Sequence, residues 1–108
     1  FRPQLLLVSA GFDAYLDDPL AGMRLTARYF ARLTAGIVAV ANECCDGRVV
    51  AVTEGGYHLK GLGDSLRAAI AALVDEVHGD DLRPEGPSPR GDAVVSEVMP
   101  YLRKYWQL

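Results

Sequence analysis

The sequence predicts an α/β fold, in which this chain contributes two buried strands and about three helices to an open parallel sheet. An apolar run without alternation occurs at Leu5–Val8 and a β-branched run at Arg48–Val52, as in strands buried on both faces. The segment between them has the apolar spacing of a helix, and a strand–helix–strand unit is almost always parallel and right-handed. We therefore expect both strands to end at the same edge of the sheet.

The first helix is predicted from Leu25 to about Glu43, after a long loop at Ala10–Arg24. Its apolar residues recur three or four positions apart, and Thr26 is suited to be its N-cap. The second helix is predicted from about Asp64 to His78, with Gly79 as its stop signal.

Prolines at positions 84, 87 and 89 mark residues 79–91 as an exposed connector, because proline cannot continue a helix or donate to a strand ladder. A last helix is predicted from about Asp92 to Trp106. We expect Pro100 to kink or divide it.

Composition excludes several classes of protein. The 108 residues carry a formal charge of −3 and the sequence pI is near 5.2, which argues against direct binding of nucleic acid. The apolar run Ala35–Ala41 is far shorter than the ~20 residues that span a bilayer. The two cysteines, Cys44 and Cys45, are adjacent, which favours a reducing cytoplasm over a secreted disulfide framework.

Two strands that are buried on both faces need further strands and helices around them, and this chain has too few. The chain also begins with Phe1 and enters a strand within a few residues. We therefore expect the rest of the domain, on a longer polypeptide or a homo-oligomer partner, to supply the missing neighbours.

Two side chains that could take part in catalysis or ligand binding follow the strands. Asp13 comes shortly after the first strand and Tyr57 after the second, at the sheet edge where α/β proteins bind ligands. A carboxylate and a phenol supply a metal ligand or base together with a hydrogen-bond donor, which suits hydrolysis of a carbonyl compound. From position alone, Asp13 could equally be a turn residue, and Tyr57 could be an aromatic cap on the sheet.

Other polar residues near these exits are expected to have structural roles. Glu54 is interpreted as an acceptor for loop amides, and Asp17 and Asp18 as groups that order the loop, with Asp18 an acceptor before Pro19. His58 is interpreted as a loop residue rather than a metal ligand.

Three blocks at the strand exits, SAGFDAYLDDPLAGM (9–23), Leu25-Thr26 and VTEGGYHL (52–59), resemble the zinc-dependent histone deacetylase family. That family includes bacterial acetoin-utilisation and acetylpolyamine deacetylases. The resemblance extends to about His78 and implies the carboxyl-terminal portion of an arginase/deacetylase-like open sheet. Tyr15 and Thr53 stand where many members carry His and Leu, which leaves the subfamily open.

The resemblance implies a zinc site in which Asp13 is the last of three zinc ligands. It implies that Tyr57 hydrogen-bonds the substrate carbonyl oxygen, that Leu20 lines the channel for the acyl chain, and that Gly55 and Gly56 let the backbone pass beside this channel. The family's other two zinc ligands and its paired histidines lie earlier in the fold. None of them is expected in this chain.

The predicted function is that of a zinc-dependent amide hydrolase acting on acylated lysine or polyamine-like amines, with residues 1–108 as the carboxyl-terminal portion of one domain. On its own the chain is expected to be inactive. The alternative is a non-catalytic interaction or assembly module whose strand edges pair with another chain. A nucleotide-binding domain fits less well, because neither glycine turn opens directly into a helix in the required pattern.

Overall fold

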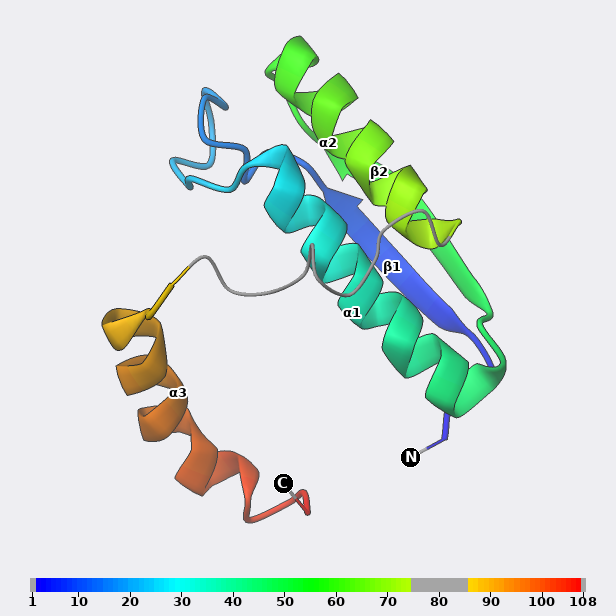
Figure 1. The fold of residues 1–108 in the computed structure, drawn as a ribbon, viewed down its shortest axis with the longest axis vertical. Coiled ribbons are helices and arrows are strands. Elements are labelled where there is room, and N and C mark those ends of the chain that lie inside the picture. Colours follow the sequence, from blue (N-terminus) through cyan, green and yellow to red (C-terminus); the bar gives the residue numbers. More distant parts are fainter. Residues whose placement is uncertain (1, 75–85, 108) are drawn as a thin grey trace.

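The computed structural model describes residues 2–74 and 86–107. Figure 1 shows the predicted order of elements, which comprises β1 (Leu6–Gly11), α1 (Ala27–Cys45), β2 (Val49–Gly55), α2 (Leu59–Leu73) and α3 (Pro89–Leu102). The predicted end of the second helix, its stop at Gly79 and most of the connector lie outside the described residues. None of the described helices combines the length and the hydropathy that crossing a bilayer requires.

The two strands are hydrogen-bonded neighbours and run parallel, as predicted from the strand–helix–strand order. Their register pairs Leu6 with Val49 at one end and Gly11 with Gly55 at the other, with an irregularity that leaves Glu54 as an extra residue in β2. Both strands continue beyond the ends predicted for them, Val8 and Val52. The residues that follow the two apolar runs, 9–11 and 53–55, therefore belong to the strands.

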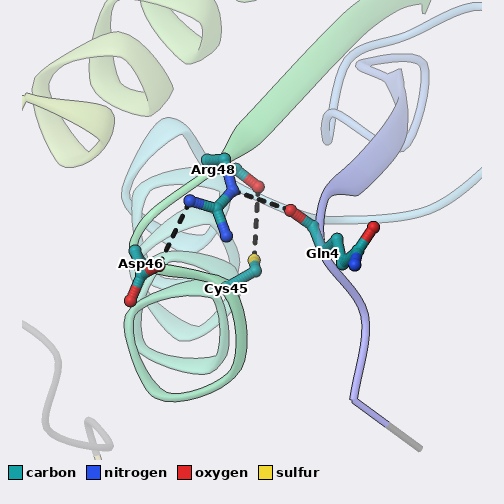
Figure 2. Close-up of polar contacts among 4 residues, drawn as sticks. All are labelled: Gln4, Cys45, Asp46 and Arg48. Carbon is teal, nitrogen blue, oxygen red and sulfur yellow. Dashed lines mark hydrogen bonds and ion pairs between the residues drawn. The ribbon is translucent and has the colours of Figure 1, made fainter.

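The amino-terminal end of the sheet is held by Arg48, as Figure 2 shows. Its guanidinium Nε donates to the carbonyl oxygen of Gln4 at 2.8 Å, and its Nη1 lies 3.1 Å from the carboxylate of Asp46. The buried thiol of Cys45 donates to the carbonyl oxygen of Arg48 at 3.4 Å. These contacts tie the turn between α1 and β2 to the chain that enters β1, which favours the observed register.

Both α1 and α2 cover the same face of the sheet and pack against each other (Figure 1). An apolar cavity of about 250 Å³ lies between that face and the two helices, with Ala51 on the sheet, Ile37 on α1 and Leu66 on α2 among its lining residues. The buried residues of α2 are all small, which lets the helices approach closely. They are Gly61, Ser65, Ala69 and Ala72.

The opposite face of the sheet has no cover from the described residues. Leu7 is 74% exposed and Val52 is 57% exposed, although the sequence pattern is that of strands buried on both faces. Helix α3 does not cover this face, because it lies apart from the sheet and has no buried residue of its own (Figure 1). The exposed apolar residues are therefore a surface suited to further protein.

The termini of the helices differ from the sequence prediction. Helix α2 begins at Leu59 rather than near Asp64, because Nδ1 of His58 accepts a hydrogen bond from the amide of Gly61 at 3.0 Å and caps the helix. The ring of Tyr15 stacks on His58, with ring centroids 5.5 Å apart. Thr26 is the N-cap of α1 as predicted, although its side chain makes no capping hydrogen bond.

Helices α3 and α1 also differ from the prediction, α3 in its first residue and α1 in the face that is covered. Helix α3 begins at Pro89, inside the segment predicted as connector, because proline is well suited to the first turn of a helix. It contains Pro100 and ends two residues later at Leu102. The apolar spacing of α1 predicts a covered face that ends with Cys44. The structure instead buries Cys45 and leaves Cys44 half-buried, so the covered face of α1 is rotated from the predicted one.

Two glycines in α2 give a matched test of this packing. A Cβ at Gly61 would lie 2.4 Å from the ring of Tyr15, whereas a Cβ at Gly63 would meet nothing within 4 Å. We expect Gly63→Ala to stabilise the protein by roughly 0.5–1 kcal/mol through the higher helix propensity of alanine. Gly61→Ala should lower the melting temperature, because Tyr15 must leave its stack on His58. Equal shifts for both variants in thermal unfolding would contradict this packing.

Candidate active site

The chain leaves both strands at the same edge of the sheet. Residues 12–26, between β1 and α1, form the first exit, and residues 56–58, between β2 and α2, form the second exit. The amide of Phe12 donates to the carbonyl oxygen of Gly55 at 2.9 Å, which continues the strand pairing into the first exit. Since Gly11 pairs with Gly55, Asp13 and Tyr57 each stand two positions beyond the same rung of the ladder. The buried ring of Phe12 packs on Phe30 of α1, with centroids 5.1 Å apart, and so anchors this exit to the core.

The carboxylate of Asp13 lies in a space left open by two glycines. A Cβ on Gly55 would lie 3.2 Å from Cγ of Asp13, and a Cβ on Gly11 would lie 3.1 Å from its Oδ1. No described residue donates a hydrogen bond to this carboxylate or pairs with it, and the residue is only partly buried. Its oxygen lone pairs are therefore free to bind a cation or a ligand.

Asp13 has no companions for a complete metal site in the part of the chain that is described. Residues 2–74 and 86–107 bring together no group of three or more His, Cys, Asp or Glu side chains that could hold a metal ion. A catalytic zinc ion usually takes three protein ligands and one open position. A carboxylate oxygen is nevertheless one of the ligand types that zinc accepts in proteins.

Gly56 has a backbone conformation and a lack of space that both require glycine. Its φ is +129°, and a Cβ there would lie 2.9 Å from Cδ1 of Leu62 and 3.0 Å from Cβ of Phe12. The next residue, Tyr57, directs a 56% exposed side chain away from the core. Leu20, in the first exit loop, is 67% exposed. Both side chains are available to contact a ligand.

The loop between β1 and α1 is closed at its base by Leu25. The amide of Leu16 donates to the carbonyl oxygen of Leu25 at 2.9 Å, and the amide of Leu25 donates to the carbonyl oxygen of Ala14 at 3.0 Å. A loop of this length is therefore folded into a compact shape that holds Asp17–Leu20 near the second exit.

Asp18 is the buried acceptor that joins the two exits. Its Oδ2 accepts hydrogen bonds from the amides of Tyr57 at 2.8 Å and His58 at 3.2 Å, and its Oδ1 accepts one from the amide of Leu20 at 3.0 Å. The residue is 8% exposed. The predicted role as a loop acceptor is confirmed, but its reach across the sequence to the second exit could not be read from the position before Pro19.

The pKa of Asp18 reflects two opposing effects. Burial opposes ionisation and raises the pKa, but the amides of Tyr57, Leu20 and His58 stabilise the charged form, so the pKa lies below the ordinary value of 3.8. Asp18 is thus an anion whose lone pairs already face backbone donors. This distinguishes it from Asp13, whose oxygens have none.

Glu54 differs from its predicted role. It is the extra residue at the strand irregularity, and it accepts a hydrogen bond from the hydroxyl of Ser9 on β1 rather than from loop amides. The neighbouring strand supplies the donor because both residues lie on the uncovered face of the sheet.

Comparisons with known proteins show which proteins this chain is similar to. The family model described as the histone deacetylase domain matches residues 1–73. The rice protein "Histone deacetylase 10, chloroplastic" (Oryza sativa subsp. japonica) is 46% identical over 70% of this chain, and a "Probable deacetylase" of Archaeoglobus fulgidus is 48% identical over 68%. The "Polyamine deacetylase HDAC10" of Homo sapiens is 43% identical over 70%. The chain spans only 17%, 21% and 11% of these relatives, respectively.

Solved structures give the same likeness in three dimensions. The structure of the histone deacetylase Clr3 superimposes with a TM-score of 0.79 at 29% identity, covering 98% of this chain and 17% of that one. The HDA15 HD domain superimposes with a TM-score of 0.72 at 28% identity, covering 94% of this chain and 26% of that one. The arrangement of the strands and helices is thus shared with deacetylase domains.

Proposed function

This chain belongs to the histone deacetylase family, and on that premise we propose that residues 1–108 are the carboxyl-terminal portion of one zinc-dependent amide hydrolase domain. The names of the relatives support a deacetylase, and their much greater length supports the view that other parts of the domain complete the fold. The sheet face that the described residues leave uncovered is where such parts would pack.

The single observation that carries the proposal is the open carboxylate of Asp13 between two glycines at the ends of paired strands. In the proposed site Asp13 is a zinc ligand, and the other ligands come from the rest of the domain. When bound there, zinc would supply Lewis-acid activation of an amide carbonyl and of the attacking water. The glycines on either side keep the carboxylate accessible from the sheet edge.

Tyr57 is proposed as the donor that stabilises the oxyanion of the tetrahedral intermediate. Its exposed side chain and that of Asp13 each belong to a residue two positions beyond the Gly11–Gly55 pair, so both side chains could face one acyl group. A preorganised donor of this kind contributes typically about 2.7–4 kcal/mol to transition-state stabilisation. Leu20 would contact the acyl-bearing chain, and the backbone of Gly55 and Gly56 would pass beside it.

The proposed substrates are acylated lysine side chains or acylated polyamine-like amines. Two kinds of support exist: several relatives are named histone deacetylases, and the human relative is named a polyamine deacetylase. An exposed apolar residue beside the site, Leu20, suits the aliphatic stem that both classes of substrate share.

One observation favours a second candidate function. The uncovered sheet face, with Leu7 at 74% exposure, would serve equally well in a non-catalytic assembly module that pairs with another chain. The zinc content of the complete domain separates the two functions, because only the hydrolase requires bound metal.

For Asp13, we expect substitution by alanine in the complete domain to lower zinc occupancy and amide hydrolysis together, since a side chain that binds the zinc ion directly is lost. Elemental analysis and an acetyl-lysine assay measure the two effects. Asp17→Ala is the matched control, because Asp17 is exposed and its side chain has no hydrogen bond or ion pair with a described residue, contrary to the loop-ordering role predicted for it. Normal zinc content in Asp13→Ala would place the metal elsewhere.

For Tyr57, we expect Tyr57→Phe in the complete domain to lower kcat by roughly 10²- to 10³-fold, the usual effect of losing one oxyanion donor. Zinc content and melting temperature should be unchanged, since the ring still fills its space. Tyr105→Phe serves as the control, because Tyr105 is 82% exposed on the segment after α3. A zinc-loaded Tyr57→Phe protein with nearly full activity would show that another group stabilises the oxyanion.

The 108-residue chain on its own should self-associate, bind zinc weakly and fail to hydrolyse acetyl-lysine. The reason is that its described residues offer one candidate ligand, an unpaired edge on each of the two strands and an open apolar face. Light scattering, zinc titration and a deacetylase assay on the isolated chain measure these properties. An active monomer would contradict the assignment of the remaining site to other parts of the domain.

A further inference from the structure

The carboxylate of Asp18 joins two residues that are proposed to contact the same substrate from different loops. Oδ1 accepts from the amide of Leu20, and Oδ2 accepts from the amide of Tyr57, 39 positions from Asp18 in the sequence. Among the described contacts, this carboxylate supplies the side-chain hydrogen bonds between the first exit loop and the residues that follow Gly56.

We propose that Asp18 is a positioning residue of the amide hydrolase: its carboxylate fixes the backbone of Tyr57 relative to Leu20, so that the phenol meets the carbonyl oxygen of an acyl chain lying against Leu20. The inference rests on the function proposed above. It assigns to Asp18 neither metal binding nor contact with substrate.

An anionic acceptor with two oxygens suits this position for a physical reason. Three backbone amides converge on a residue that is 8% exposed, and a buried amide without a partner costs about 1–3 kcal/mol. Hydrogen bonds to an ionised acceptor are shorter and stronger than those between neutral groups. The depressed pKa of Asp18 agrees, because it means that the carboxylate stays charged at neutral pH.

The position of Tyr57 depends on such a tether because its own side chain gives little anchorage. The side chain is 56% exposed, and the residue follows Gly56, whose φ of +129° belongs to a conformation with few steric restraints on glycine. Without the bond from its amide to Asp18, the backbone of Tyr57 would be held mainly through the start of α2. A displacement of about 1 Å at a reacting group can cost on the order of 10²-fold in rate.

The test compares Asp18→Ala with the control Asp17→Ala in the complete, zinc-loaded domain. We expect Asp18→Ala to lower kcat roughly 10- to 100-fold through Tyr57 and to raise KM through Leu20, with zinc content unchanged. Asp17→Ala should leave both constants within about twofold, as exposed substitutions usually do. Equal effects of the two variants, or full activity of Asp18→Ala, would overturn the inference.

A double-mutant cycle with Tyr57→Phe separates positioning from a general structural role. If Asp18 acts through the phenol, then adding Asp18→Ala to Tyr57→Phe should lower kcat by less than about twofold further, while the rise in KM persists. A purely structural effect would lower kcat by the same factor in both backgrounds, and that result would overturn the inference.

A measurement on the wild-type domain tests the tether even if Asp18→Ala fails to fold. Hydrogen exchange resolved at single residues should show the amide of Tyr57 protected although its side chain is exposed. Rapid exchange at this amide would overturn the inference. A wild-type domain without zinc or amide hydrolysis would overturn the proposed function as well, whereas an active domain that is impaired by Tyr57→Phe but not by Asp18→Ala would overturn the positioning role alone.

Discussion

The parallel pairing of β1 and β2 is the constraint on which the site depends. Because the strands run in the same direction and Gly11 pairs with Gly55, the chain leaves both strands at the same edge of the sheet, just after this last pair of the ladder. This brings Asp13 against Gly55 and lets Asp18 reach the amide of Tyr57. At the opposite edge, Arg48 holds the entry of β1 against the turn before β2, so the register is supported from both ends.

The same pairing explains why helices cover one face of the sheet, while the described residues leave the other face uncovered. A strand–helix–strand unit places its crossover helix on one face, and α2 returns to that face because its small residues pack closely on α1. The alternate residues of both strands, such as Leu7 and Val52, then have no cover among the described elements. In a deacetylase domain several times longer than this chain, further helices and strands are available for that face.

The sequence was sufficient for the order of elements, the parallel sheet and the family, because unalternated strands and glycine-rich exits are local patterns. It was insufficient wherever a distant partner decides the outcome. The start of α2 depends on His58, which is outside the usual N-cap residues, and on the ring of Tyr15 stacked above it. Likewise, the irregularity at Glu54 and the bond to Ser9 arise from pairing across strands, which no spacing within β2 encodes.

Two aspartates in one loop show how contacts, rather than residue type, distinguish a carboxylate that is available for binding from one that is already hydrogen-bonded. An ionised carboxylate has about four lone-pair sites. In Asp18 these sites face three backbone amides in a buried position, so binding a metal there would leave buried donors without acceptors. In Asp13 no described donor competes, and the adjacent glycines keep the space open. A metal ion would therefore bind Asp13 without breaking any described hydrogen bond, while Asp18 keeps the two exits together.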